Sequence, residues 1–249
     1  NLARLSDLKQ TFSQIYYGAK HVFWISAWAK GALHYKFQGL PDSCSELPIV
    51  CKIESYSRSY SILKLRFCII LSYHQRHRKG LLPLLEALAL LRSQGRSIHL
   101  DIIGTGTAKD VEAVRKQIEA LNLDDLVTML GGVSHQQVLD ILSQSKGLLL
   151  PALNETFGMA YVEALACNCP ILYMANTGID GHLDDVNVGV KLQSQSVGNI
   201  AEGIKEIECN YKDIEKELKM INETGYLKKF TAEVVANHYL NMLIKLTKC

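Results

Sequence analysis

The chain has 249 residues, of which 48% are hydrophobic and 21% charged, so it can bury a sizeable core. Its formal net charge of +2 argues against nucleic acid as a bulk electrostatic partner. No apolar run reaches the ~18–20 residues that cross a bilayer, and no signal-peptide pattern is present. Seven cysteines without a Cys-x-x-Cys pair predict reduced thiols. We expect a cytoplasmic protein that could also contact the inner face of a membrane.

The first 60 residues contain too few predicted elements for a complete α/β domain. Residues 19–26 predict one strand, and a helix is expected from Ala27. One strand with one or two helices cannot form a Rossmann-type domain, which needs several parallel strands covered on both faces. Residues 1–60 are therefore predicted to form only part of a domain.

From about residue 61 onward, short apolar runs alternate with segments of helical periodicity. The predicted strands are residues 65–71, 98–103, 126–130, 148–150, 170–173 and 189–192. The predicted helices are residues 81–91, 109–121, 136–143, 157–166 and 196–208. This alternation implies right-handed crossovers and a parallel sheet covered on both faces. The predicted fold class is α/β, a Rossmann-like doubly wound parallel sheet that binds ligands at the carboxyl ends of its strands.

The loop after the first of these strands is basic. Arg76, Arg78 and Lys79 lie there together with His77, and Gly80 follows. Cationic side chains at the carboxyl end of a parallel strand suit a diphosphate. A solvated basic turn without a ligand is the alternative interpretation.

Glycines follow the next two predicted strands. Gly104 and Gly106 lack the third glycine of a dinucleotide fingerprint, so a tight strand-to-helix turn is the favoured explanation. Gly132 and Val133 lie where a glycine lets the backbone approach a flat ligand. Ser134 equally predicts an N-cap for the next helix, and that role needs no ligand.

Two glutamates eight positions apart, Glu155 and Glu163, form the most informative pattern. A buried strand precedes Glu155, and Phe157, Gly158 and Met159 are predicted to open the helix that carries Glu163. A helix N-terminus presents unpaired N–H groups that suit phosphate, and nearby carboxylates can accept hydrogen bonds from sugar hydroxyls. A nucleotide-sugar offers both groups. In the alternative, Glu155 only favours the helix dipole, by about 0.3–1 kcal/mol, and Glu163 is an exposed helix residue.

The run Pro-x-x-x-Glu-x-Phe-Gly-x-x-x-x-Glu-Ala-x-Ala-x-x-x-Pro, at residues 151–170, resembles the Glu-x7-Glu signature of retaining GT-B glycosyltransferases of family four. Further segments in the same order extend this resemblance over most of residues 61–249. It implies that residues 61–249 form the nucleotide-sugar donor-binding domain, the C-terminal half of a GT-B protein. Residues 1–60 resemble a remnant of the N-terminal acceptor domain with its linker, and residues 224–248 resemble the closing helix.

The resemblance also implies roles for single residues. Lys79, with Arg76 or Arg78, would hold the donor diphosphate, and Glu155 would stabilise positive charge at the anomeric carbon, so Lys79 and Glu155 are the predicted catalytic residues. Glu163 would accept hydrogen bonds from the ribose hydroxyls. The remaining predicted donor-binding residues are Phe157, Gly158, Met159, Gly104, Gly132, Val133, Thr177 and Gly178.

Several positions depart from the family pattern. Ser72 and Tyr73 stand where the family has Gly-Arg, so an arginine later in the loop would have to replace it. Asn168 stands where a glycine is usual, and the acidic end of the family's Gly-Gly-x-x-Glu is absent at Gly181. These departures favour, as an alternative, a nucleotide-binding subunit that is catalytically degenerate or depends on a partner.

The resemblance implies a retaining, metal-independent transfer of a hexose from a UDP- or GDP-sugar to a glycan or lipid-linked acceptor. No cofactor and no metal are expected. The expected setting is bacterial surface polysaccharide synthesis, such as that of lipopolysaccharide or capsule. An N-terminal acceptor domain or a partner chain would complete the enzyme, so this chain alone should bind donor but transfer sugar poorly. A nucleotide-sugar epimerase is less favoured, and the incomplete glycine fingerprint disfavours an oxidoreductase.

Overall fold

The computed structural model of the protein describes residues 19, 21–26, 29–32, 35, 43–51, 53 and 66–247. The start of the helix expected from Ala27, the end of the predicted linker before residue 61 and the end of the last predicted helix at Lys248 lie outside the described residues.

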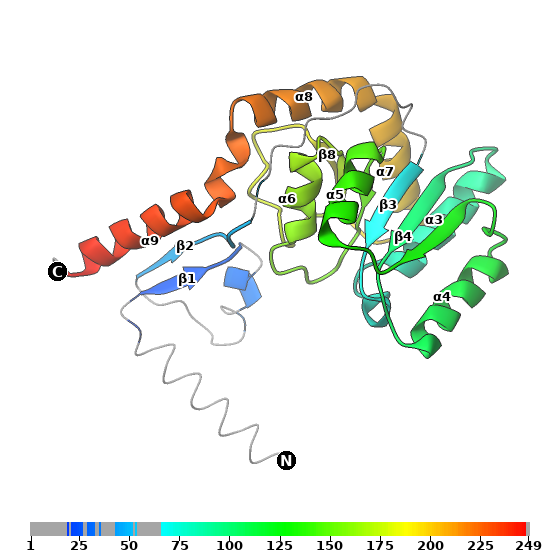
Figure 1. Cartoon of the computed structure of the whole chain (residues 1–249), viewed down its shortest axis with the longest axis horizontal. Helices are drawn as coiled ribbons and strands as arrows, with labels where there is room; N and C mark the ends of the chain where they lie inside the picture. Colours follow the sequence, from blue (N-terminus) through cyan, green and yellow to red (C-terminus); the bar gives the residue numbers. More distant parts are fainter. Residues whose placement is uncertain are drawn as a thin grey trace, which may run out of the picture.

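A six-stranded parallel sheet forms the centre of the protein (Figure 1). Its strands are β3 (Arg66–Ile70), β4 (His99–Ile103), β5 (Val127–Gly131), β6 (Leu148–Leu149), β7 (Ile171–Met174) and β8 (Gly189–Leu192). Their order is β5-β4-β3-β6-β7-β8, so the sheet grows outward from β3 in one direction and from β6 in the other. This order is the doubly wound arrangement of a Rossmann-like fold, with a topological switch point between β3 and β6. The predicted fold class is confirmed.

Helices connect the strands and cover both faces of the sheet. In the described part of the chain they are α3 (Leu81–Ser93), α4 (Ala108–Ala120), α5 (His135–Gln144), α6 (Met159–Ala166) and α7 (Val197–Cys209). The contacts of α3 with α4 and α7, and of α5 with α6, divide them into two groups, one for each face. All strands and helices predicted between residues 65 and 208 are present, with ends that differ by at most two residues.

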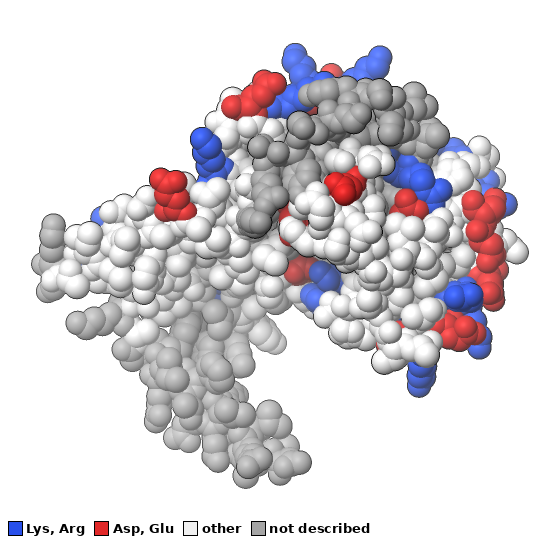
Figure 2. All heavy atoms as spheres, viewed as in Figure 1, with Lys and Arg blue, Asp and Glu red and all other residues white. Residues whose placement is uncertain are grey.

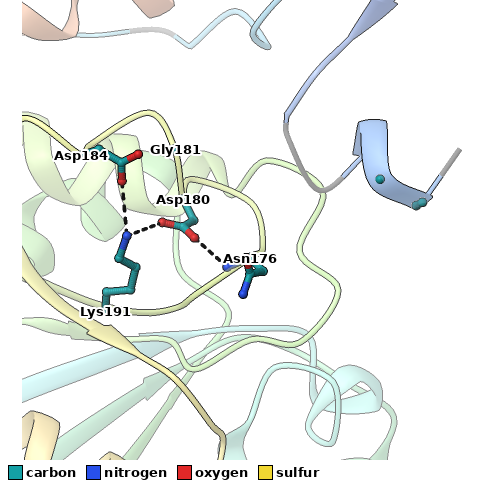
Figure 3. Close-up of a pocket in the computed structure, with 7 residues that line it drawn as sticks. Asn176, Asp180, Gly181, Asp184 and Lys191 are labelled. Atoms are coloured by element: carbon teal, nitrogen blue, oxygen red, sulfur yellow. Dashed lines mark hydrogen bonds and ion pairs between the residues drawn. The ribbon is translucent and has the colours of Figure 1, made fainter. Parts of the chain in front are cut away.

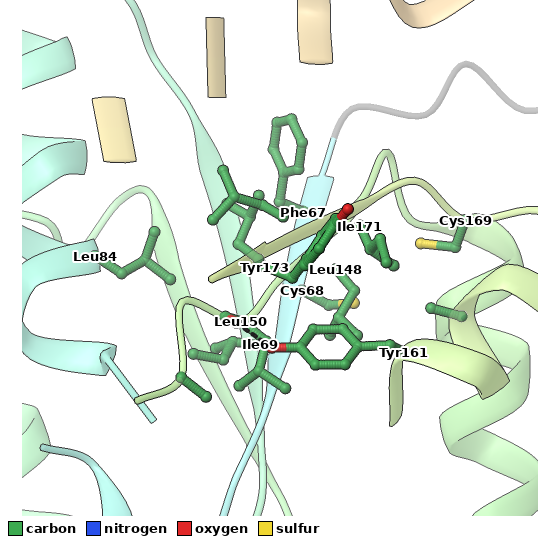
Figure 4. Close-up of a cluster of buried hydrophobic side chains, with 14 of the residues drawn as sticks. Phe67, Cys68, Ile69, Leu84, Leu148, Leu150, Tyr161, Cys169, Ile171 and Tyr173 are labelled. Carbon is green, nitrogen blue, oxygen red and sulfur yellow. Dashed lines mark hydrogen bonds between the residues drawn. The ribbon is translucent and has the colours of Figure 1, made fainter. Parts of the chain in front are cut away.

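The core lies between the central strands and the helices (Figure 4). Phe67, Leu84 and Ile171 are among its fully buried side chains, each worth about 1.5–3 kcal/mol of burial. Tyr161 of α6 crosses this core, and its hydroxyl donates to the carbonyl of Leu150 at 2.6 Å. Burial raises the pKa of Tyr161 far above its ordinary value, so the phenol stays protonated and ties α6 to the end of β6. The six cysteines that the structure describes are free thiols, most of them buried.

The chain leaves the sheet through α8 (Tyr211–Glu223), a short 3-10 helix η2 (Tyr226–Phe230) and α9 (Ala232–Thr247). The single helix predicted over residues 224–248 is wrong at its start, because η2 lies between α8 and α9. Gly225 has a left-handed backbone with φ of 71°, which a right-handed helix cannot continue through. α8 was not predicted.

Two short N-terminal strands, β1 (Val22–Trp24) and β2 (Cys44–Glu46), form a separate parallel sheet. This sheet lies beside α9 (Figure 1), where the ring centroids of Phe23 and Tyr239 are 5.3 Å apart. β2 was not predicted, because its Cys-Ser-Glu sequence contains no run of large apolar residues, unlike the Val-Phe-Trp of β1. The boundary near residue 60 between an N-terminal remnant and the donor-binding domain stays a prediction.

The surface of α9 differs from the surfaces of α4 and α8. Acidic and basic side chains are mixed over α4 and α8 (Figure 2). In α9, Glu233 is the only acidic residue and Lys245 the only lysine or arginine. Leu240 and Ile244 of α9 are half exposed. Within the described ranges, no helix combines the length and the apolarity needed to cross a bilayer.

Candidate functional site

The loops that leave β3 and β6 meet at the switch point of the sheet. The first leads from β3 to α3, and the second contains the acidic turn, residues 154–158. The N–H of Leu153 donates to the carbonyl of Arg78 at 2.8 Å, so the two loops are joined directly. Doubly wound sheets bind their ligands in the crevice between such loops.

Lys79 and Glu155, the two residues predicted to be catalytic, form an ion pair between these loops. The Nζ of Lys79 donates to Oε2 of Glu155, and the side chains are only 15% and 9% exposed. Removing one partner of such a buried pair typically costs about 3–5 kcal/mol, because the other charge stays buried and unpaired. The ion pair is the central feature of the candidate site.

Two helices begin beside this ion pair from glycine. α3 follows Gly80 and α6 follows Gly158; both glycines have left-handed φ values, 73° and 88°, and no described side chain caps either helix. The other helices that cover the sheet are capped by hydroxyl side chains: Thr107, Ser134 and Ser196. An uncapped N-terminus leaves N–H groups for an anion at α6, whereas at α3 the N–H of Leu81 donates to the carbonyl of Arg76 and Pro83 has no N–H. The prediction that α6 opens with Phe157 is wrong, because Gly158 is its N-cap.

The side chain of Phe157 is part of the core. It is 1% exposed, and its ring centroid lies 5.5 Å from those of His182 and Phe230. Met159 is half exposed in the first turn of α6. The buried ring fixes the acidic turn, whose backbone amides are the groups predicted to contact the donor.

Thr177 and Gly178 lie against the acidic turn. The N–H of Gly178 donates to the carbonyl of Glu155 at 2.7 Å, and the hydroxyl of Thr177 donates to the carbonyl of Met174 at 3.2 Å. A Cβ atom at position 178 would come within 2.9 Å of Cγ of Glu155. The tertiary structure therefore brings these two predicted donor-binding residues beside the ion pair.

The sequence left open whether Arg76 or Arg78 contacts the donor diphosphate. In the structure the two side chains have different partners. Arg76 forms an ion pair with Asp110, in the first turn of α4, at 3.0 Å. Arg78 donates to the carbonyl of Asn154 at 3.2 Å, directly before Glu155 in the chain. Arg78 is therefore the arginine held at the acidic turn.

Glu163 on α6 faces a residue that was not predicted to belong to the site. Its Oε1 lies 3.1 Å from Nε2 of His135, the first residue of α5. The N-cap Ser134 places His135 directly after the loop that holds Gly132 and Val133. The pair thus joins the predicted ribose-binding carboxylate to the loop predicted to lie near the base. The sequence signal that could have identified His135 was Ser134, because a serine predicted as an N-cap places the next residue in the first turn of the helix.

Packing alone explains why glycine stands at positions 104 and 132, without any ligand. A Cβ atom at 104 would come within 2.8 Å of the carbonyl carbon of Leu71, and one at 132 would overlap Thr105. Both glycines also line a cavity of about 240 Å³ together with Tyr73. The tight-turn interpretation of Gly104 is therefore sufficient, and its role in donor binding stays a prediction.

Tyr73, at the position of the family's arginine, is buried. Its side chain is 1% exposed and packs against Gly106. Burial raises the pKa of the Tyr73 hydroxyl, and this oxygen has no hydrogen-bond partner among the described residues. A neutral, buried phenol cannot balance the charge of a diphosphate.

Another cavity, of about 470 Å³, lies between residues 31–32 and the loop after β7 (Figure 3). Lys191 of β8 donates to Asp180 at 2.9 Å and to Asp184 at 3.2 Å, and the bond to Asp180 chiefly raises the pKa of Lys191. None of the described residues that line this cavity was a predicted site residue. Among the described residues, no group of three or more His, Cys, Asp or Glu could hold a metal ion.

The doubly wound sheet, with a cation–carboxylate pair at its switch point, is that of a Rossmann-like ligand-binding domain. The chain belongs to the family of glycosyl transferases group 1, whose family model matches residues 54–227.

Curated relatives match part of the chain. It is 34% identical over 106 residues to the gpi3 subunit of phosphatidylinositol N-acetylglucosaminyltransferase of Schizosaccharomyces pombe, covering 42% of this chain and 22% of that protein. It is 25% identical over 166 residues to 2-deoxystreptamine N-acetyl-D-glucosaminyltransferase of Niallia circulans, covering 67% and 42%. The chain therefore spans less than half the length of these relatives.

Solved structures share the fold over nearly the whole chain. Sucrose-phosphate synthase of Thermosynechococcus elongatus superposes with a TM-score of 0.76 at 18% identity, covering 98% of this chain and 62% of that one. HepE of Anabaena, in complex with UDP and glucose, superposes with a TM-score of 0.77 at 15% identity, covering 95% and 66%. At these identities the likeness shows the fold alone.

Proposed function

We propose that this chain is the donor-binding half of a retaining, metal-independent glycosyltransferase that moves a hexose from a nucleoside diphosphate sugar to an acceptor hydroxyl. The observation that carries the proposal is the ion pair between Lys79 and Glu155 at the switch point, beside the uncapped N-terminus of α6. Bound diphosphate would compete with Glu155 for Lys79 and would accept hydrogen bonds from the helix N–H groups.

This arrangement suits the departure of a nucleoside diphosphate. Negative charge grows on the leaving diphosphate, where Lys79 and the start of α6 would stabilise it. Positive charge grows at the anomeric carbon, where the freed carboxylate of Glu155 would stabilise it. Both groups lie at the same switch point and are largely shielded from water, which strengthens these interactions.

The nucleoside would extend from the ion pair along α6 toward α5. Glu163 would accept hydrogen bonds from the ribose hydroxyls, and its contact with His135 fixes the carboxylate beside the Gly132–Val133 loop. Backbone groups in that loop would contact the base, UDP or GDP being the expected nucleotides.

For the acceptor we propose a cyclitol or a lipid-linked cyclitol. The two relatives described above are named for phosphatidylinositol and 2-deoxystreptamine, and others are named for D-inositol 3-phosphate and phosphatidyl-myo-inositol. All these compounds contain a polyhydroxylated six-membered carbon ring. Surface polysaccharide synthesis and attachment at the inner face of a membrane stay predictions.

A second candidate is a partner-dependent subunit that binds nucleotide without transferring sugar by itself. Tyr73 favours it, because this buried phenol replaces a phosphate-binding arginine of the family. The name of the gpi3 relative, which calls it a subunit, supports the same idea. In either case an N-terminal acceptor domain or a partner chain would supply the acceptor groups.

A thermal-shift titration with UDP, GDP and ADP tests the proposed function. We expect one nucleotide at 100 times its Kd to stabilise the protein by about 2.7 kcal/mol, or about 5–10 °C. Glu163→Ala should abolish this shift by removing the ribose contact, whereas Glu112→Ala, an exposed glutamate of α4, should retain it. Failure of all three nucleotides to stabilise the wild-type chain would contradict the proposal.

Arg78→Ala should affect nucleotide affinity, whereas Arg76→Ala should affect stability. We expect Arg78→Ala to weaken nucleotide binding about tenfold or more at nearly unchanged stability, because the half-buried Arg78 lies at the acidic turn and donates there to the neutral groups of Asn154 and Gln75. Arg76→Ala should leave nucleotide affinity within about twofold and lower stability by about 1 kcal/mol, because it breaks the ion pair with Asp110 of α4. Calorimetric titration and urea unfolding measure the two effects. The reverse pattern would assign the phosphate contact to Arg76.

A further inference from the structure

A cavity of about 240 Å³ lies at the carboxyl ends of β3, β4 and β5, and the loops that leave these strands form most of its wall. Tyr73 and Arg115 line it, together with residues 104–106 after β4 and residues 131–132 at the end of β5. The proposed ribose-binding carboxylate of Glu163 contacts the first residue of α5, a short distance along the chain from residues 131–132. A base attached to that ribose would therefore lie at this cavity.

Bare backbone makes up much of the cavity wall. Positions 104, 106, 131 and 132 are glycines, and no described atom lies within 4 Å of the position that a Cβ of residue 131 would take. A backbone without side chains allows the close approach of a flat ring. Val111 and Met129 add apolar side chains to the lining. The cavity therefore suits a flat heteroaromatic ring such as a nucleobase.

Tyr73, in this wall, has an unsatisfied hydroxyl. Its side chain is 1% exposed, and its hydroxyl oxygen is buried without a hydrogen-bond partner among the described residues. Buried polar groups nearly always have a partner, because an unpaired one loses its hydrogen bonds to water without replacement. Burial also raises the pKa of Tyr73, so the phenol stays protonated and its O–H needs an acceptor. A ligand in the cavity can supply that acceptor.

Arg115 of α4 is the charged side chain in the described lining of this cavity. It is exposed, and within the described ranges it is the only arginine that has neither a hydrogen bond nor an ion pair, because every other one donates to an oxygen of the protein. A guanidinium group donates through several N–H groups in one plane and accepts no hydrogen bond. Arg115 is therefore free to donate to acceptors on the edge of a flat ligand.

These two side chains favour one class of base. Uracil and guanine present a carbonyl oxygen at the position where cytosine and adenine carry an amino group. A carbonyl oxygen accepts hydrogen bonds from a phenol or a guanidinium group. An amino group at the same place would face the guanidinium group as a second donor and leave it unpaired. Donors in the wall therefore favour a carbonyl-bearing base.

We propose that Tyr73 and Arg115 are specificity-determining residues of a nucleobase site in this cavity, and that they select a base with a carbonyl edge, uracil or guanine. Each donates to an acceptor of the base, while the glycine backbone of residues 131–132 contacts the ring. The inference rests on the proposed function, because it concerns the base of the same nucleotide. It also gives the buried phenol of Tyr73 a role that does not require it to balance the charge of a diphosphate.

Calorimetric titration of the chain with two pairs of nucleotides tests the selection. UDP and CDP differ in the carbonyl or amino group on C4 of the base, and GDP and ADP differ in the same way on C6. We expect UDP to bind at least about tenfold more tightly than CDP, or GDP than ADP. The pair that shows this preference identifies the base as a pyrimidine or a purine.

Tyr73→Phe keeps the ring and removes the hydroxyl. We expect it to weaken binding of the preferred nucleotide about three- to tenfold, because one hydrogen bond to the base is lost. The ligand-free variant should be at least as stable as the wild type, because no described group depends on that hydroxyl. Urea unfolding measures this stability. A loss of stability with unchanged affinity would show that the hydroxyl is structural and would overturn its role in selection.

Arg115→Met should bring the two affinities of the preferred pair within about threefold of each other. Lys116→Met, at the next position of α4, also removes one exposed positive charge and should preserve the preference. An unchanged preference in both Arg115→Met and Tyr73→Phe would overturn the assignment. Equal affinities within both pairs, with binding that Glu163→Ala abolishes, would overturn base selection and leave the proposed function intact. If none of the four nucleotides binds, both the inference and the proposed function are wrong.

Discussion

Lys79→Met should lower stability by about 3 kcal/mol and abolish nucleotide binding. The substitution keeps all but the terminal atom of the side chain's length but leaves the carboxylate of Glu155 buried without its cation. For a chain of this size the loss corresponds to about 6–12 °C in the midpoint of thermal unfolding. Calorimetric titration with the nucleotide that stabilises the wild type measures the loss of binding.

The double variant Lys79→Met/Glu155→Gln separates stability from binding. A neutral amide beside a neutral thioether restores most of the stability, because no charge is left buried and unpaired. Binding should remain absent, because the buried cation of Lys79 at the switch point no longer faces the diphosphate. Lys116→Met, at an exposed position of α4, controls for the loss of one positive charge. Full nucleotide affinity in the double variant would show that Lys79 is a structural residue only.

Gly158→Ala should destabilise the protein by about 2–5 kcal/mol and impair the site. A left-handed backbone costs alanine about 1–2 kcal/mol, and the new Cβ would overlap the ring of Tyr161, with Cε2 at 2.6 Å. Relief of that overlap costs about 1–3 kcal/mol more and shifts the start of α6 relative to Glu155. Urea unfolding and nucleotide titration measure the two consequences.

Gly181→Ala is a matched control for this change. Gly181 has the same φ of 88°, but no described atom lies within 4 Å of the position of a new Cβ. The variant should therefore show only the backbone cost of about 1–2 kcal/mol. Equal destabilisation by the two substitutions would mean that the start of α6 adapts freely, contrary to a rigid anion site.

The sequence by itself determined the order of the strands and helices from residue 66 to 209. Each strand is a short apolar run and each helix has its own periodicity, so local physics is enough to define them. The spacing of Glu155 and Glu163 likewise placed one carboxylate before α6 and the other within it. α8 and β2 were not predicted. The resemblance predicted one helix over residues 224–248, whereas Gly225 interrupts it and η2 precedes α9.

Only the tertiary structure decided which of these residues meet. Lys79 and Glu155 are 76 positions apart, and their ion pair exists because β3 and β6 are neighbours at the switch point. The same sheet order directs Arg78 to the acidic turn and Arg76 to α4, a choice that neighbouring positions in a loop do not reveal. Periodicity reports which face of an element is buried, whereas contacts between distant loops depend on strand order and packing. For this reason the candidate chemistry could be read from the sequence, but its geometry could not.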